Sequence, residues 1–141
     1  MKKYTIKDVS EMLNISEHTL RFWAKSDFFP FVKRDENNIR IFTEDDLAWV
    51  KIVKCLRHVG VDNKSIKKYI DLCIEGDSTI KERYEIIKTT KEKALTKMND
   101  LQEQLKLLDY KESFYKDLIK NNKEDIWNPT NKNYTSGNCC K

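Results

Sequence analysis

The sequence predicts a mainly helical protein in which a small head with a two-stranded wing precedes one long helix. The 141 residues include only three glycines and two prolines, so few positions break a helix. Apolar residues recur at helical spacing in several short N-terminal segments, each preceded by a capping residue. After residue 78 the apolar residues advance by alternating threes and fours over about five heptads, which favours one long helix.

The first two predicted helices are short and are joined by a tight turn. Thr5 caps a helix that ends near residue 13, with Asp8 as its capping-box partner. Ser16 caps a second helix that ends near Lys25. The buried side of this second helix is expected to hold Leu20, Trp23 and Ala24.

A small hairpin, which we call the wing, is predicted between residues 31 and 42. Two short extended runs flank a polar turn, in which Asn37 and Asn38 tolerate a left-handed backbone. The side chains expected to anchor the wing on the head are Phe28, Phe29 and Phe31. Two short helices joined by a tight turn and followed by such a hairpin describe a winged helix-turn-helix, which is a DNA-binding arrangement.

Two further short helices are expected to complete the head. The third helix is capped by Thr43 with Asp46 and ends before Gly60, which is a usual C-terminal signal. A fourth helix starts at Asp62 or Asn63 and ends near Gly76. We therefore expect a winged helix-turn-helix DNA-binding domain over residues 1–76.

The second helix combines large rings with positive charge on one face. Arginine and lysine side chains meet phosphates, and a phenylalanine ring can lie against a sugar or a thymine methyl group. Such a face is also compatible with an ordinary solvated surface, but the basic residues that flank the wing turn favour DNA. The candidate DNA-binding residues are His18, Thr19, Arg21, Phe22, Lys25, Lys33, Arg34, Asn38 and Arg40.

The predicted long helix carries an apolar stripe that a lone helix would leave in water. At about 1.5 Å per residue, about 40 residues give a rod about 60 Å long. The head is too small to cover the whole stripe, so we favour a coiled coil with a second copy of the chain over folding back onto the head. The dimerisation helix is expected over residues 77–121, and its seam residues are Ile87, Ala94, Met98, Leu101, Leu105, Leu108, Tyr115 and Ile119.

Residues 122–141 are rich in Asn, Lys, Thr and Ser and are predicted to form a flexible tail. Within this tail, Ile126 and Trp127 are candidates to pack against the dimer, the alternative being an unstructured segment. The tail also holds the adjacent Cys139 and Cys140. Because tetrahedral sites prefer spaced ligands, we expect no metal site and no cofactor.

Residues 4 to about 75 resemble the DNA-binding head of the mercury-resistance regulator (MerR) family. The matching positions, in chain order, are Thr19-Leu20-Arg21, Phe22-Trp23, Pro30, Arg34, Arg40 and Phe42. The resemblance implies that Arg21 and Arg40 contact DNA, whereas Phe22 lacks the hydroxyl of the family's tyrosine and gives only a packing contact. At two positions where the family has glycine, this chain has Asp27 and Asn38.

The resemblance also implies a function. It implies a homodimer whose long helices pair antiparallel and whose two heads bind a pseudo-palindromic promoter element. Such dimers bend and untwist the DNA between the half-sites, which realigns the promoter for RNA polymerase. A coiled-coil protein that anchors or organises the chromosome through the same head is the alternative. No nucleophile–base pattern suggests an enzyme and no apolar run suggests a membrane span, so we expect a cytoplasmic protein.

Cys55 is a candidate sensor of electrophile or thiol stress. It resembles the lone head cysteine of the family branch that responds to aldehydes, and positively charged neighbours in the sequence favour a thiolate. The alternative is a small buried packing residue, because Cys55 shares a helix face with Ala48, Ile52 and Val59. Both roles stay open on the sequence alone, and Cys73 is expected to be a packing residue.

Overall fold

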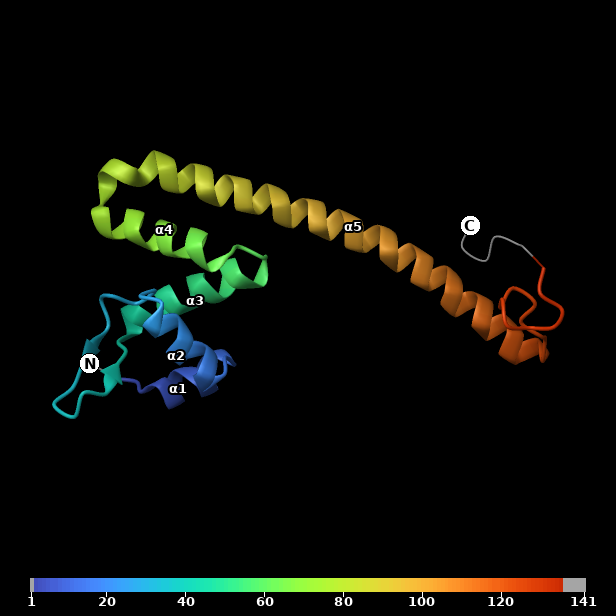
Figure 1. The fold of residues 1–141 in the computed structure, drawn as a ribbon, viewed down its shortest axis with the longest axis horizontal. Helices are drawn as coiled ribbons and strands as arrows, with labels where there is room; N and C mark the ends of the chain where they lie inside the picture. The colour runs from blue at the N-terminus through green and yellow to red at the C-terminus, as the bar shows by residue number, and fades with distance from the viewer. Residues whose placement is uncertain (1, 136–141) are drawn as a thin grey trace. The chain divides into compact units, whose positions relative to one another are not determined.

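The computed structural model describes residues 2–135 and is mainly helical with a two-stranded wing, as the sequence predicts (Figure 1). The elements are, in order, α1 (Ile6–Leu13), α2 (Glu17–Lys25), β1 (Lys33–Arg34), β2 (Arg40–Ile41), α3 (Glu44–His58), α4 (Asn63–Glu75), the 3₁₀ helix η1 (Asp77–Thr79) and α5 (Ile80–Asn121). The chain divides into two units, Met1–Lys93 and Ala94–Lys141, and α5 begins in the first and ends in the second. Within residues 2–135, no helix is both long enough and apolar enough to cross a membrane.

Side-chain caps set the N-terminal ends of α1 to α4 at the predicted residues. Thr5 and Thr43 each form a capping box, in which the threonine and an aspartate three residues later accept hydrogen bonds from each other's backbone N–H groups. Ser16 and Asp62 each accept from the N–H group three residues later. Each cap satisfies a donor that a helix start leaves unpaired, so the local sequence fixes where these helices begin.

An aromatic cluster joins the wing to the helices. The ring of Phe29 meets those of Trp23 and Phe42 edge-on, with centroid distances of 6.5 and 5.9 Å. Phe31 packs on Trp49 of α3, with ring centroids 5.4 Å apart. The anchoring predicted for Phe29 and Phe31 is therefore confirmed. The buried core around this cluster includes Val9, Ile15, Leu20, Phe28, Leu47, Val50, Val53, Leu56, Ile66 and Ile70.

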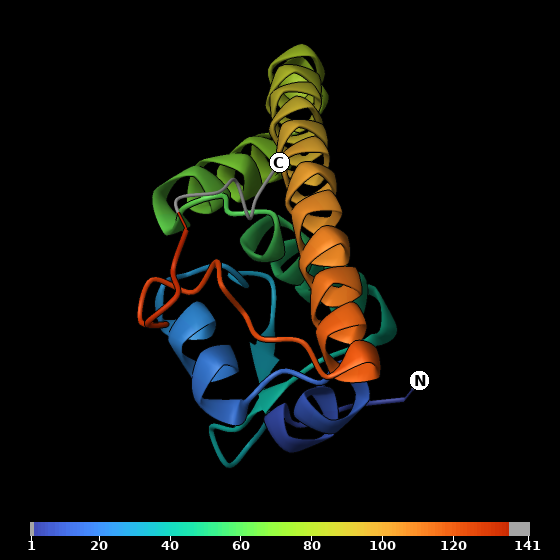
Figure 2. The same ribbon diagram turned by 90° about the vertical axis from the view of Figure 1, so that its right-hand side faces the viewer.

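The wing is a short antiparallel hairpin that is tied to the N-terminal segment. In its register, Arg34 of β1 stands directly opposite Arg40 of β2. Phe42, which follows β2, bridges to Tyr4: the Tyr4 N–H donates to the Phe42 carbonyl at 2.9 Å, and the Phe42 N–H donates to the Tyr4 carbonyl at 2.8 Å. The bridge brings the start of α1 to the base of the wing, and Figure 2 shows the two strands beside α1 and α2.

Two residues adopt a left-handed backbone at positions where the resembled family has glycine. Asp27 and Asn38 both have a φ of 62°. Aspartate and asparagine tolerate this region better than other side chains do. The Asp27 carboxylate accepts from Lys67 Nζ at 3.0 Å, and the Asn38 N–H donates to the Asp35 carbonyl at 3.0 Å. Both residues therefore keep the turns that glycine would allow.

A buried threonine connects α4 to α5. The hydroxyl of Thr79 lies 2.5 Å from the carbonyl oxygen of Leu72 and 2.8 Å from that of Gly76. Arg83, one turn into α5, donates to the Thr79 hydroxyl at 3.0 Å and to the Gly76 carbonyl at 3.1 Å. These bonds satisfy carbonyl groups at the end of α4 and fix the sharp turn into α5 that Figure 1 shows.

Residues 122–135 form hydrogen-bonded turns, which the sequence did not predict. Side-chain oxygens of Asp125, Asn128 and Asn131 each accept from the N–H group two residues later. Trp127 stacks on Phe114 of α5, with ring centroids 4.9 Å apart. The asparagines make this segment polar, but their side chains also close short turns that return the chain to its own helix.

Candidate nucleic-acid interface

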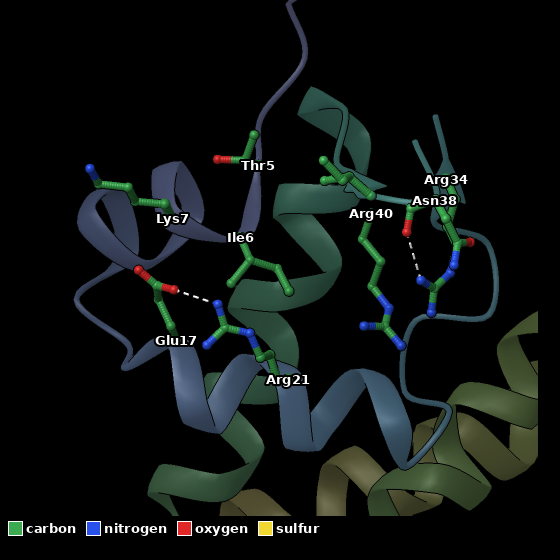
Figure 3. Close-up of a pocket in the computed structure, with 9 residues that line it drawn as sticks. Thr5, Ile6, Lys7, Glu17, Arg21, Arg34, Asn38 and Arg40 are labelled. Atoms are coloured by element: carbon green, nitrogen blue, oxygen red, sulfur yellow. Dashed lines mark hydrogen bonds and ion pairs between the residues drawn. The ribbon is translucent and has the colours of Figure 1, made fainter. Parts of the chain in front are cut away.

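A cleft of about 310 Å³ lies between the start of α1, α2 and the wing (Figure 3). It is lined by four cationic side chains and one carboxylate, which belong to Lys7, Arg21, Arg34, Arg40 and Glu17. The other lining residues are Thr5, Ile6, Asn38 and Ile39. We call this site the arginine cleft. Its concave shape and its excess of guanidinium groups suit an anion.

The hydrogen-bonded ladder of the wing places two of these arginines face to face. Arg34 and Arg40 are register partners on β1 and β2. Like charges directly opposite each other destabilise a pair of strands. The pair therefore costs stability in the free protein, and an anion beside the two guanidinium groups relieves their repulsion.

Arg40 carries the least compensated charge among the three arginines of the cleft. Among the residues that the structure describes, its guanidinium has no hydrogen-bond or ion-pair partner, and its side chain is half-buried. Burial, followed by the charge of Arg34, lowers the pKa of Arg40 below its ordinary value. Arginine nevertheless remains protonated in proteins, so Arg40 holds a partly desolvated positive charge that an anion would stabilise.

The other two arginines of the cleft are engaged by groups of their own chain. Arg34 donates through Nη1 to the carbonyl oxygen of Asn38 at 2.8 Å. Arg21 donates through Nη2 to Glu17 Oε2 at 2.6 Å, and the two residues lie one helical turn apart on α2. Figure 3 marks both contacts and shows the Arg40 guanidinium between them without one. Because a guanidinium has five N–H donors, each of these arginines retains donors for a further acceptor.

Five of the predicted DNA contacts lie outside the arginine cleft. His18, Phe22 and Lys25 are exposed on α2, and Lys33 is exposed on β1. Thr19 is half-buried, and its hydroxyl lies 2.8 Å from that of the residue that caps α2. These side chains therefore lie on the outer surface of α2 and β1 rather than in the cleft. The predicted contacts that the cleft brings together are Arg21, Arg34, Asn38 and Arg40.

The contributions of α1 and of Glu17 to the cleft were not predicted from the sequence. Lys7 and the two residues before it reach the cleft because the bridge at Phe42 draws the N-terminal segment to the wing. No local pattern encodes this long-range pairing. Glu17 did have a local signal, since it precedes Arg21 by four residues, which is the spacing of an ion pair on a helix.

The apolar stripe of α5 is open to solvent in the single chain. No side chain within α5 is fully buried, and Leu101 and Ile119 are 64% and 81% exposed. Ala94 is half-buried. A stripe of this kind indicates an interaction surface. The other exposed seam residues are Ile87, Met98, Leu105, Leu108 and Tyr115.

Cys55 is exposed on α3, which does not support the role of a buried packing residue. Two cationic side chains beside it in the sequence are hydrogen-bonded to backbone carbonyls. Lys54 donates to the carbonyl of Leu13 at 2.7 Å, and Arg57 donates to that of Val61 at 2.9 Å. These bonds direct both side chains toward backbone carbonyl groups.

The other cysteines differ from Cys55 in their surroundings. Cys73 on α4 is half-buried beside Tyr69, and burial, followed by the interaction with Cys73, raises the pKa of Tyr69. Cys139 and Cys140 lie outside the described residues. Within residues 2–135, no group of three His, Cys, Asp or Glu side chains is arranged to hold a metal ion.

Comparisons with known proteins identify the family. The sequence pattern of the MerR HTH family regulatory proteins matches residues 4–73. An uncharacterized HTH-type transcriptional regulator of Haemophilus influenzae is 38% identical over 112 residues, which cover 79% of this chain and 83% of that protein. This chain belongs to the MerR family.

Solved structures of MerR-family proteins share the fold of this chain. The crystal structure of HiNmlR, a MerR family regulator lacking the sensor domain and bound to promoter DNA, is 35% identical, with a TM-score of 0.79 over 84% of this chain and 94% of that chain. A MerR family regulator from Bacillus thuringiensis is 33% identical, with a TM-score of 0.76 over 81% of this chain and 100% of that chain. The region that matches the MerR pattern, residues 4–73, includes every residue of the arginine cleft.

Replacing Arg40 by glutamine is expected to weaken binding to any DNA duplex by about tenfold at low salt, because one charge-assisted contact to a phosphate is lost. The slope of log K against log salt should also become shallower by about 0.9 for each head. Fluorescence anisotropy with a labelled duplex over a salt series measures both quantities. Arg57→Gln removes the same charge from α3, outside the cleft, and should bind as the wild type does. An Arg40→Gln variant with unchanged affinity and slope would remove the cleft from the interface.

Proposed function

We propose that this chain is a transcriptional regulator that binds promoter DNA as a homodimer and controls transcription by RNA polymerase there. The observation that carries the proposal is the arginine cleft, in which the half-buried charge of Arg40 has no partner among the described residues. A backbone phosphate supplies the missing negative charge and accepts paired hydrogen bonds from guanidinium groups. The likeness to HiNmlR, which is bound to promoter DNA in its crystal, supports the same function.

In this proposal the cleft fixes the position of the head, and α2 reads the sequence. Phosphate contacts set register, whereas base edges in the major groove carry the sequence information. The exposed face of α2 turns toward the groove, and Phe22, which is 49% exposed, lies against a sugar or a thymine methyl group. The contacts outside the cleft are His18, Thr19, Phe22, Lys25 and Lys33.

In the proposed dimer, each chain has three regions with different roles. Residues 1–76 bind DNA, residues 77–121 form the dimerisation helix, and residues 122–141 form the tail. The exposed stripe of α5 supports pairing with a second copy, because the same seam on both chains is self-complementary. Antiparallel pairing sets the two heads apart and suits the two halves of a pseudo-palindromic element.

The proposed outcome is control of transcription through the shape of the DNA. Two heads on one dimer bend and untwist the duplex between them, which changes how RNA polymerase engages the promoter. The proposed role is regulatory rather than catalytic. A protein that works on promoter DNA with RNA polymerase is expected in the cytoplasm. A footprint at one promoter with altered transcription in vitro is the expected result. Uniform coating of DNA without a transcriptional effect would instead indicate a protein that organises the chromosome.

Leu105→Glu is expected to convert the dimer into monomers at micromolar concentration, because it buries a carboxylate in an apolar seam. DNA binding should then weaken by about a hundredfold or more, since the two heads no longer bind as one unit. Analytical ultracentrifugation and anisotropy measure the two effects. Lys106→Glu places the same carboxylate one residue later, off the seam, and should leave a dimer. A Leu105→Glu protein that stays dimeric would contradict the proposed seam.

We also propose that Cys55 is the site at which electrophiles act on this regulator. Its exposure on α3 leaves the thiol accessible. The Cys55 sulfur adds to the β-carbon of an α,β-unsaturated aldehyde, which forms a carbon–sulfur bond and reduces the carbon–carbon double bond to a single bond. The thiol proton passes to solvent, and solvent supplies a proton to the adjacent carbon. The adduct places a new group on the helix that packs behind the wing.

Cys55→Ser is expected to abolish any change in promoter transcription that acrolein produces in vitro, because serine does not form the thioether. Cys73→Ser is the matched control and should respond as the wild type does, since Cys73 is half-buried. Mass spectrometry of the treated proteins shows which thiol carries the adduct. A Cys55→Ser protein that still responds would assign the sensing to another residue.

A further inference from the structure

The arginine cleft contains one negatively charged side chain. Its cationic residues are Lys7, Arg21, Arg34 and Arg40, and Glu17 contributes the carboxylate. Glu17 is the first residue of α2, directly after the N-cap, and it lines the site proposed for a backbone phosphate. Figure 3 shows this carboxylate turned toward the Arg21 guanidinium.

The contact between Glu17 and Arg21 engages one of the arginines that the phosphate requires. Glu17 Oε2 lies 2.6 Å from Arg21 Nη2, and the two side chains are 39% and 55% exposed. A phosphate that binds Arg21 must either displace the carboxylate or share the guanidinium with it. In the second case two like charges lie within a few ångströms of each other, which weakens binding of the phosphate.

We propose that Glu17 limits the affinity of the arginine cleft for DNA by competing with a backbone phosphate for Arg21. This inference rests on the proposed function, because it concerns the same cleft. The shared guanidinium makes Glu17 a positioning residue that acts through Arg21. A phosphate contact carries no base information, so the competition weakens target and unrelated duplexes by the same factor.

Glu17 could also assist DNA binding by holding Arg21 in place. This effect is weaker than the competition between Glu17 and a phosphate. Exposed ion pairs one helical turn apart contribute little stability, so the pair restricts Arg21 only slightly. The carboxylate of Glu17, by contrast, remains on the Arg21 guanidinium and acts against the phosphate that Arg21 binds. The electrostatic cost therefore exceeds the gain from preorganisation.

The consequence is a head that releases unrelated DNA more readily. Non-specific binding rests almost entirely on phosphate contacts, and it determines how long a regulator stays on the wrong sites. A carboxylate in the cleft shortens that time without changing the ratio of specific to non-specific affinity. Base contacts on the exposed face of α2 still set that ratio.

The test compares Glu17→Gln with the wild type on two duplexes. One duplex is selected by the wild-type protein from a random pool, and the other is a scrambled duplex of equal length. Glu17→Gln is expected to bind both about threefold to tenfold more tightly at low salt, with the ratio of the two affinities unchanged and the gain shrinking as salt rises. Glu11→Gln on α1 removes the same charge outside the cleft and should bind as the wild type does.

A double-variant cycle shows whether the effect passes through Arg21. In the Arg21→Gln background, Glu17→Gln should give less than half of its gain on a logarithmic scale, because the shared partner is absent. Circular dichroism checks the fold, and Glu17→Ser repeats the test if Glu17→Gln loses helical signal, since serine suits the start of a helix.

The outcomes separate this inference from the proposed function. If the wild type binds the selected duplex and Glu17→Gln binds it equally or more weakly, the competition by Glu17 is refuted and the proposed function stands. A full gain in the Arg21→Gln background would refute the role of Arg21 in the effect. A wild-type protein that binds neither duplex would refute the proposed function and this inference together.

Discussion

Phe42 is the residue on which the geometry of the DNA-binding head depends. Its side chain is completely buried against Phe29, and its backbone pairs with Tyr4. This pairing draws the start of α1 to the wing and so closes the arginine cleft on one side. Because side chains two residues apart on a strand point to the same face, Arg40 lies at the edge of the core that Phe42 fills. One aromatic anchor therefore sets both the position of the wing and the desolvation of Arg40.

The two arginines that face each other across the wing lower the stability of the hairpin, and the proposed function accounts for their presence. A hairpin selected for stability alone would not place Arg34 opposite Arg40, because the two charges repel. The strain is tolerable because the aromatic anchor holds the strands independently of their side-chain pairing. In the proposed complex a phosphate relieves this repulsion, and the cleft that would hold it is already formed in the free chain.

Most of the secondary structure of this protein could be predicted from its sequence, because the signals that determine it are local. The capping residues Thr5, Ser16, Thr43 and Asp62 gave the starts of the short helices, and the heptad spacing gave α5. The arginines of the cleft were also predicted. The cleft itself was not, because it depends on the pairing of Tyr4 with Phe42. These two residues are far apart in the sequence, and local patterns do not encode such a pairing. The hydrogen-bonded turns after α5 were not predicted, because asparagine is common both in flexible segments and in turns.

We propose that the arginine cleft binds one backbone phosphate in each half-site, and neutralising the phosphates of a duplex one at a time tests this binding. A selected duplex is prepared with a methylphosphonate at each position in turn, and its affinity is measured for the wild type and for Arg40→Gln. We expect one position in each half-site where neutralisation weakens binding of the wild type by about tenfold and leaves binding of Arg40→Gln unchanged, because the variant already lacks the contact. Equal losses for the two proteins at every position would contradict it.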